Sequence, residues 1–307
     1  MLKRLVDRLG TTHIAGIDLG SAKLKIVELT RAEGHISLRR CVIVDTISDG
    51  PLLAQVLTEA GVSTRNVAIG IASPELIVKP LQFPHMPKKE LASAIRLEAE
   101  QAILNGHTVA EMATDWHALP SHAHEDVRGL LAVTPKSLIA ERTKLFAAAG
   151  LRPVVIDVEG LALWNAYWTL VGAQEAADRT VLLMNVGAQT TNLVVVKGQQ
   201  ELLLMRDLRF GAVALGAGQG SDWSAEIYDS LAYARASGGL RTLDAVYVTG
   251  GGSGPNLISL LRSAVAAPVT FWNPLQQLKH DPLCPPVDPS VGPMLAIAIG
   301  LALRQHG

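Results

Sequence analysis

Residues 13–29 read HIAGIDLGSAKLKIVEL and place a glycine-containing turn between two runs of aliphatic residues. The alternation of apolar residues predicts strands over 14–18 and 24–29, joined through residues 19–21. A turn of this kind is most often a plain hairpin. It can also leave backbone N–H groups pointing into a concavity that suits a phosphate, because glycine tolerates the backbone angles required. The rest of the chain has to distinguish these two interpretations.

The composition is that of an ordinary globular protein. With 307 residues, 49% hydrophobic and 18% charged, we expect one compact unit of two lobes. A net charge of −1 argues against a non-specific nucleic-acid binder, which needs a basic surface. The longest apolar run, residues 294–303, is shorter than the roughly 20 residues that span a bilayer and predicts a buried core helix. Cys41 and Cys284 are the only cysteines, and they favour a reducing compartment such as the cytosol.

Two further stretches have a structural interpretation that we prefer to a functional one. Residues 1–10, MLKRLVDRLG, lack the features of a signal peptide and predict a short amphipathic helix packed on its own domain. The alternative is a weak contact with a membrane surface or a partner. A histidine-rich segment at 116–126 predicts a solvated loop rather than a zinc site. The candidate ligands in it are His117, His122, His124 and Glu125.

Strands and helices alternate in the same order in both halves of the chain. The first half predicts strands over 14–18, 24–29, 35–44 and 66–72, with a helix over 51–60. The second half predicts strands over 180–186, 192–197, 201–206 and 245–248, with helices over 223–237, 255–265 and 291–304. The stretch between the two halves predicts a small α/β subdomain. Its expected strands are one ending before Pro84 and two over 112–119 and 127–134, and its expected helices lie over 88–104 and 135–149.

A second turn has the design of the first. NVGAQTTN, residues 185–192, and DLGSAKLK, residues 18–25, both pass from a polar residue through a glycine into a new strand. Two such turns from similar lobes can clamp a phosphate chain between them, and Asp18 suits a hydrated Mg²⁺. Three glycines at 250–252 would let a base or ribose lie against the backbone. Each feature alone is weak, but together and in this order they favour phosphate binding.

This order of motifs resembles the actin, hexokinase and Hsp70 class of nucleotide-binding proteins. Residues 18–21 (DLGS) are similar to its first phosphate motif, 185–191 (NVGAQTT) to its second and 248–252 (VTGGG) to its adenosine motif. Within the class, nearly the whole chain is similar to the PilM family of type IV pilus assembly proteins, which is related to the division protein FtsA. The segments that carry this resemblance are GIDLGSAKLKIVEL (16–29), LQFPHMPKKELASAIRLEAEQAI (81–103), AAAGLRPVVIDVEGLALWNA (147–166) and FWNPL (271–275).

The resemblance implies an α/β, actin-like fold, that is, a duplicated ribonuclease H-like architecture of two lobes. It also implies an inserted 1C-type α/β subdomain and a reduced 2B subdomain. The expected segments are the first part of lobe 1A at 11–72, the 1C-like subdomain at 73–151, a return to lobe 1A at 152–178, the second lobe with 2A and a shortened 2B at 179–290, and a closing helix back to lobe 1 at 291–307.

The resemblance further implies a site for ATP or ADP with Mg²⁺, with Asp18 as the metal ligand. The nucleotide-binding residues that it implies are Asp18, Gly20, Ser21, Lys23, Asn185, Gly187, Gln189, Thr190, Thr191, Gly250, Gly251 and Gly252. Two departures argue against hydrolysis. Asn185 replaces an aspartate that would help to hold Mg²⁺ or orient water, and residues 212–222 are too few for the usual subdomain beside the adenosine. We expect nucleotide binding with little or no turnover, in preference to loss of both or a genuine ATPase.

Asp18 and Asp157 are the candidate catalytic residues. Asp157 and Glu159 can face the nucleotide, because the equivalent family segment enters a helix that lines its site. Acids at a helix start also simply stabilise the helix N-terminus. The alternative function is an ATP-dependent enzyme, either an ATPase or a small-molecule kinase, with Asp157 as its catalytic aspartate. A shortened second lobe argues against the closure that a kinase needs to exclude water.

The function implied by the resemblance is that of a cytoplasmic adapter at the inner face of the inner membrane, in a type IV pilus or a related secretion machine. It would bind the N-terminal cytoplasmic segment of a PilN-like membrane protein as an extended peptide, with apolar side chains in pockets and backbone pairing to an edge strand. The expected contact residues are Leu76, Val78, Leu81, Phe83, Ile95 and Leu97, each of which can equally belong to the subdomain core. Head-to-tail contacts between such lobes can also build filaments, and the sequence leaves the oligomeric state open.

Overall fold

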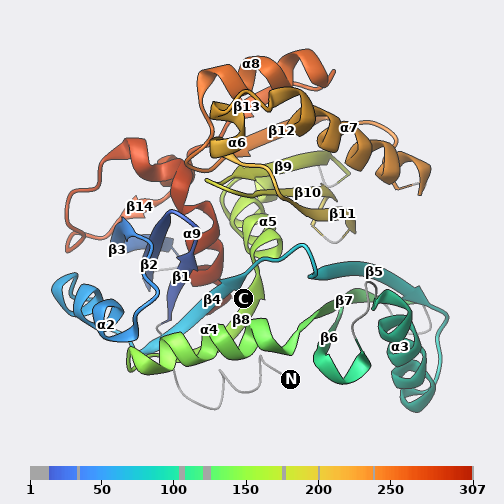
Figure 1. Ribbon diagram of the computed structural model, residues 1–307, viewed down its shortest axis with the longest axis horizontal. Helices are drawn as coiled ribbons and strands as arrows, with labels where there is room; N and C mark the ends of the chain where they lie inside the picture. The colour runs from blue at the N-terminus through green and yellow to red at the C-terminus, as the bar shows by residue number, and fades with distance from the viewer. Residues whose placement is uncertain are drawn as a thin grey trace.

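The computed structural model describes residues 14–32, 35–103, 108–119, 126–174, 178–199, 201–237 and 239–305. The amphipathic stretch at 1–10 and the possible metal ligands His122, His124 and Glu125 lie outside these residues. The described chain forms two lobes, each built on a mixed β-sheet, and a smaller body with a three-stranded sheet (Figure 1).

The first lobe contains an antiparallel meander followed by two parallel strands. Its sheet has the order β14-β3-β2-β1-β4-β8. These strands are β1 (Ala15–Leu19), β2 (Lys23–Ala32), β3 (His35–Asp45), β4 (Asn66–Ile71), β8 (Arg152–Val158) and β14 (Lys279–His280). Two helices, α2 (Gly50–Glu59) and α4 (Lys136–Ala148), cover one face, where Leu53 and Phe146 pack with Ile17 and Ile69.

The second lobe repeats this strand order. Its sheet has the order β11-β10-β9-β12-β13, with a meander of three antiparallel strands and two parallel additions. The strands are β9 (Thr180–Val186), β10 (Thr191–Lys197), β11 (Glu201–Leu208), β12 (Ala245–Thr249) and β13 (Val269–Phe271). The helices are α6 (Ala212–Gly216), α7 (Gly220–Ala236) and α8 (Pro255–Ala264). The predicted duplication and two-lobed α/β fold are therefore confirmed.

The predicted buried helix near the C-terminus is confirmed, but it begins later than expected. Residues Pro289–Leu295 form 3₁₀ turns, and α9 covers Ala296–Ala302, all of it buried. Pro293 explains the delay, because it has no N–H and its carbonyl accepts from Gly250 N at 2.9 Å. None of the helices within the described ranges has the length and apolarity needed to cross a lipid bilayer.

Two buried helices join the lobes. α9 packs against α5 (Glu159–Leu170), and both contribute to a core that includes strands of both sheets (Figure 1). The helices approach closely at Gly300, where a side chain would overlap the carbonyl of Ala162, so glycine is required. Asn165 Nδ2 also donates to Gly300 O at 2.9 Å. Because the lobes share one core, we expect them to unfold together.

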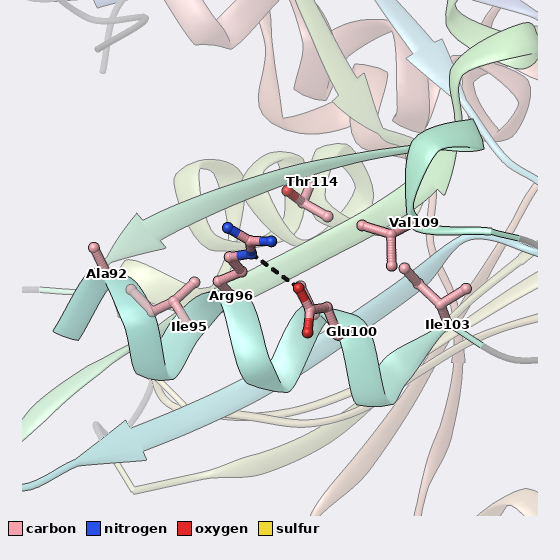
Figure 2. A pocket seen from close by; sticks show the side chains of 8 residues that line it. Ala92, Ile95, Arg96, Glu100, Ile103, Val109 and Thr114 are labelled. Atoms are coloured by element: carbon pink, nitrogen blue, oxygen red, sulfur yellow. Dashed lines mark hydrogen bonds and ion pairs between the residues drawn. The ribbon is translucent and has the colours of Figure 1, made fainter. Parts of the chain in front are cut away.

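The smaller body has the strand order β5-β7-β6 with one long helix on it. It contains β5 (Ile77–Phe83), α3 (Lys88–Ala102), a 3₁₀ turn at Val109–Glu111, β6 (Met112–Ala118) and β7 (Val127–Pro135). A cavity of about 300 Å³ opens between α3 and β6 (Figure 2). It is lined by Ala92, Ile95, Arg96, Ala99, Glu100, Ile103, Val109 and Thr114.

One helix differs from its expected position. Residues 135–149 were expected in the inserted subdomain, whereas α4 packs on the first lobe. Its Phe146 is buried with Leu53 and Leu57, and a side chain on Gly50 would overlap Ala148. The reason is the apolar side of α4, which packs on α2 and on the first sheet.

Candidate functional site

The first turn joins β1 to β2 and is closed by two hydrogen bonds. Gly20 N donates to Lys23 O at 3.1 Å, and Thr46 Oγ1 donates to Gly20 O at 2.7 Å. The backbone N–H groups of Ser21 and Ala22 donate to no acceptor within the described part of the chain. Lys23 is exposed and its Nζ lies 2.8 Å from Asp45 Oδ1. The turn therefore has two backbone donors without an acceptor in the described part of the chain, which an anion site requires.

The second turn, between β9 and β10, is held from behind by α6. Gly187 N donates to Thr190 O at 2.9 Å, while the carbonyls of residues 187 and 188 accept from the first two N–H groups of α6. Gln189 is exposed. Thr191 is fully buried, and its hydroxyl donates to Phe210 O at 2.7 Å and accepts from Trp223 Nε1 at 3.3 Å. Thr191 thus supports the turn from inside the lobe.

The three predicted adenosine-side glycines lie against the second turn. Gly250 has a φ of +98° and packs so closely on Val186 that a side chain would overlap its backbone. Gly252 N donates to Val186 O at 2.8 Å, and Gly251 is exposed. Thr249 Oγ1 donates to Pro293 O at 2.8 Å, which ties the strip to the closing segment. The structure therefore brings the second and third motifs together.

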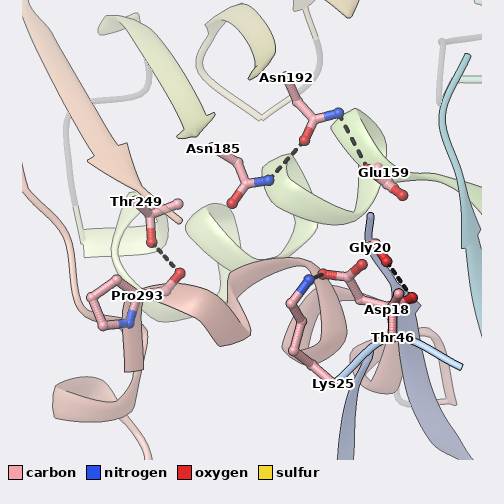
Figure 3. Close-up of polar contacts among 9 residues, drawn as sticks. All are labelled: Asp18, Gly20, Lys25, Thr46, Glu159, Asn185, Asn192, Thr249 and Pro293. Atoms are coloured by element: carbon pink, nitrogen blue, oxygen red, sulfur yellow. Dashed lines mark hydrogen bonds and ion pairs between the residues drawn. The ribbon is translucent and has the colours of Figure 1, made fainter. Parts of the chain in front are cut away.

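A polar cluster connects the first and second motifs across the lobes, and we call it the interlobe cluster (Figure 3). It consists of Asp18, Lys25, Glu159 and Asn192, which Figure 3 labels, and of Asp207, which the figure does not draw. Asn192 Nδ2 donates to Asp207 Oδ1 at 2.8 Å and contacts Glu159 Oε2 at 3.4 Å. The charge of Asp18, which lies on the first lobe as Glu159 does, also acts on Glu159. The two glycine turns therefore flank the start of α5.

Asn185 is part of the same arrangement. Its Nδ2 donates to Asn192 Oδ1 at 2.8 Å, so its amide is oriented by the interlobe cluster (Figure 3). An amide at this position carries no charge to hold a cation. The second motif therefore offers hydrogen bonding in place of a second carboxylate.

Two carboxyl groups of the interlobe cluster have raised pKa values. Burial, with a smaller contribution from the charges of Asp18 and Asp207, raises the pKa of Glu159 to about 8. Burial also raises the pKa of Asp207, although hydrogen bonds from Asn192 and from the backbone of Ser73 oppose this. The cluster therefore holds Glu159 mainly protonated at neutral pH.

The first turn contains a buried ion pair. Lys25 Nζ lies 2.9 Å from Asp18 Oδ2, and the two side chains are 14% and 6% exposed. The pairing register of the β1–β2 hairpin places these two residues directly opposite each other. Charge on Asp18 is therefore balanced by the protein itself.

Asp157 is engaged in a different contact. Its Oδ2 accepts from Arg304 Nε at 2.6 Å, and its Oδ1 accepts from Val158 N at 2.9 Å. The carboxylate thus ties β8 to the segment that follows α9. A general base needs an oxygen directed at a substrate hydroxyl, and here both oxygens have partners.

The expected partner-contact residues are divided between core and surface. Val78 is buried in the core that the lobes share, and Leu76 packs against it. Leu81 and Ile95 pack on the core of the three-stranded body, and Phe83 meets Trp116 edge to face at 6.0 Å. Leu97 is 55% exposed. Of these six, Ile95 lines the α3–β6 cavity.

Sequence reasoning missed Lys25, Asn192 and Asp207. Lys25 had a usable signal, because a hairpin that turns at residues 20–22 pairs it with Asp18. The sequence signal for Asn192 and Asp207 was weaker. These two residues are neighbours only through the β10–β11 pairing, and they meet Glu159 from the other lobe. Burial of these polar residues could not be read from their local sequence.

Two lobes of one strand order, joined by a shared core and carrying facing glycine turns, define a protein of the actin-like class. The sequence pattern of the family described as type IV pilus assembly protein PilM matches residues 16–217. This match covers more than half of the chain, and the chain belongs to that family.

The chain is also similar to several solved structures. A chain of a "PilM-PilN type IV pilus biogenesis complex" is 25% identical with a TM-score of 0.79, and the match covers 96% of this chain and 98% of that one. A Bacteroides thetaiotaomicron protein with an actin-like ATPase fold and unknown function is 12% identical, with a TM-score of 0.48 over 88% and 96% of the two chains. The archaeal actin homolog Ta0583, in complex with ADP, is 13% identical, with a TM-score of 0.43 over 94% and 97%.

Proposed function

We propose that this protein is a cytoplasmic scaffold of type IV pilus assembly that binds the N-terminal cytoplasmic segment of a PilN-like inner-membrane protein. Such binding would hold it at the inner face of the inner membrane. The observation that carries the proposal is the similarity to a chain of the PilM–PilN complex over almost the full length of both chains. A type II secretion-like machine remains the related setting in which the same adapter role would apply.

We place the partner segment on the three-stranded body, beside α3. β6 is an edge strand of its sheet, so its outer side can pair with an extended peptide. The α3–β6 cavity adjoins this edge, and Ile95 and Val109 give it apolar walls (Figure 2). Arg96 and Glu100, paired at 2.9 Å, provide a polar rim. An apolar anchor residue of the peptide would occupy the cavity.

A peptide titration tests this site. A fluorescent peptide with the cytoplasmic N-terminal sequence of the PilN-like protein is titrated with wild-type protein and with Ala92→Arg, which fills the cavity from an exposed position. We expect Ala92→Arg to weaken binding at least about tenfold. Ser93→Arg is the matched control, because Ser93 is exposed on the same helix but does not line the cavity. Equal affinities for both variants and wild type would contradict the placement, and absence of any binding would contradict the adapter function.

We also propose that the two glycine turns bind ATP or ADP with little or no hydrolysis. The N–H groups of Ser21 and Ala22, which have no acceptor among the described residues, support binding, whereas the neutral Asn185 and the ion-paired Asp157 argue against turnover. For the same reason the ATP-dependent enzyme is not favoured. Equilibrium binding of ATP and phosphate release, measured on one preparation, test this proposal, and steady phosphate release above the buffer rate would contradict it.

A further inference from the structure

We infer that the ammonium group of Lys25 takes the place of a divalent cation at the first turn, so that this protein binds a nucleotide without Mg²⁺. The inference rests on the proposed nucleotide binding and specifies its chemistry. It concerns one residue, Lys25, which would both balance Asp18 and contact a phosphate.

The position of Lys25 is determined by the hairpin. Asp18 and Lys25 are opposite each other in the β1–β2 register, so their side chains lie on the same face of the sheet. Both side chains are largely buried on this face, and Lys25 Nζ lies 2.9 Å from Asp18 Oδ2 (Figure 3). A side-chain carbon on Gly20 would lie 2.7 Å from Nζ. The ammonium group therefore lies beside the turn, in space that a glycine leaves open.

The residues at this position do not fit Mg²⁺. The ion requires near-octahedral oxygen ligands and usually takes one or two carboxylates together with phosphates and water. Asp18 Oδ2 already accepts from Lys25, and a dication at Asp18 would meet a like charge. The second motif supplies the neutral Asn185, whose Nδ2 is used by Asn192. In the part of the chain that the structure describes, no group of three or more His, Cys, Asp or Glu side chains could hold a metal ion.

An ammonium group can supply the positive charge that a phosphate needs at this position. It has three donors, and one of them is used by Asp18. The other two are available for phosphate oxygens, for which lysine is a common ligand acting as a point charge. The N–H groups of Ser21 and Ala22 lie in the same turn and add neutral donors. A phosphate there would contact one full positive charge and a backbone concavity.

ATP binding is measured calorimetrically with excess EDTA and with excess Mg²⁺. We expect the two dissociation constants of the wild-type protein to agree within about twofold. Lys25→Met should weaken binding in EDTA by at least about tenfold, and Mg²⁺ should restore part of that loss because Asp18 is then unpaired. Lys197→Met, at an exposed site on β10, is the control and should bind like the wild type.

Three results decide the inference. Binding of wild-type protein only in the presence of Mg²⁺ overturns it and leaves the proposed nucleotide binding intact. Absence of binding under both conditions overturns both. Because Lys25→Met leaves a buried carboxylate without its partner, its fold is checked by circular dichroism, and Lys25→Arg provides a charged replacement that should retain metal-independent binding. Loss of the metal independence in a folded Lys25→Arg protein would also count against the inference.

Discussion

Replacing Glu159 with glutamine removes a half-buried titratable group while keeping the size of the side chain. Glu159 begins α5 and contacts Asn192 from the other lobe, and glutamine can still accept that hydrogen bond through its side-chain oxygen. The pKa of Glu159 is raised from 4.5 to about 8 by burial and by the charges of Asp18 and Asp207. The variant therefore tests whether this carboxyl group is held protonated by the folded protein.

The sign and size of the effect follow from linkage. Below pH 4.5, Glu159 is protonated in both the folded and the unfolded chain. Between pH 4.5 and 8 the unfolded chain releases the proton and the folded protein keeps it, so the free energy of unfolding falls by up to ~1.4 kcal/mol per pH unit. Over this window the wild-type protein should lose roughly 3–5 kcal/mol that Glu159→Gln does not lose. The pKa of Asp207 is also raised, so its titration lowers the free energy of unfolding with rising pH in both the wild-type protein and the variant.

Urea unfolding at pH 5, 6, 7 and 8, followed by circular dichroism, measures this difference. We expect Glu159→Gln and wild type to be nearly equal in stability at pH 5, and the variant to be the more stable at pH 8. Glu141→Gln is the control, since Glu141 is exposed on α4 and takes no part in the interlobe cluster. A Glu159→Gln difference that stays constant from pH 5 to 8 would refute the reasoning.

Three further outcomes can be checked on purified protein. Asp157→Asn, which removes the ion pair to the closing segment, should lower the free energy of unfolding by about 1–3 kcal/mol in urea titrations. Gly300→Ala should cost about 3 kcal/mol in the same assay because of its contact with α5, whereas Gly216→Ala, in open space, should be neutral or slightly stabilising. Burial raises the pKa of the Cys41 thiol to about 12 and also raises that of Cys284, where the charge of Arg40 opposes it, so iodoacetamide should modify Cys284 before Cys41, as peptide mass spectrometry would reveal.

Much of the fold was accessible from the sequence because it depends on local pattern. Both meanders were predicted within a few residues, since alternating apolar residues and glycine turns determine hairpins locally. The helix α3 was predicted at 88–104 and ends at Ala102. β8 was not predicted as a strand, because its sequence, RPVVIDV, lacks the alternation of apolar and polar residues that indicates a strand.

Other features required distant parts of the chain. Whether α4 belonged to the first lobe or to the three-stranded body depended on which surface its apolar side met. Val78, expected at a partner surface, is buried because the three-stranded body lies against the second lobe, where β5 meets β11. Neither outcome has a local signature, since an apolar residue is compatible with both a core and a groove.

By itself, the sequence determined the two glycine turns, their order and their placement at strand ends, because hairpin geometry is settled by neighbouring residues. Only the tertiary structure decided which polar groups meet between the lobes. The raised pKa of Glu159 and the role of Asn192 arise from residues on two different lobes. Such groups are brought together by the burial of the shared core around α5 and α9, and burial in turn gives their charges the strength that they lack in water.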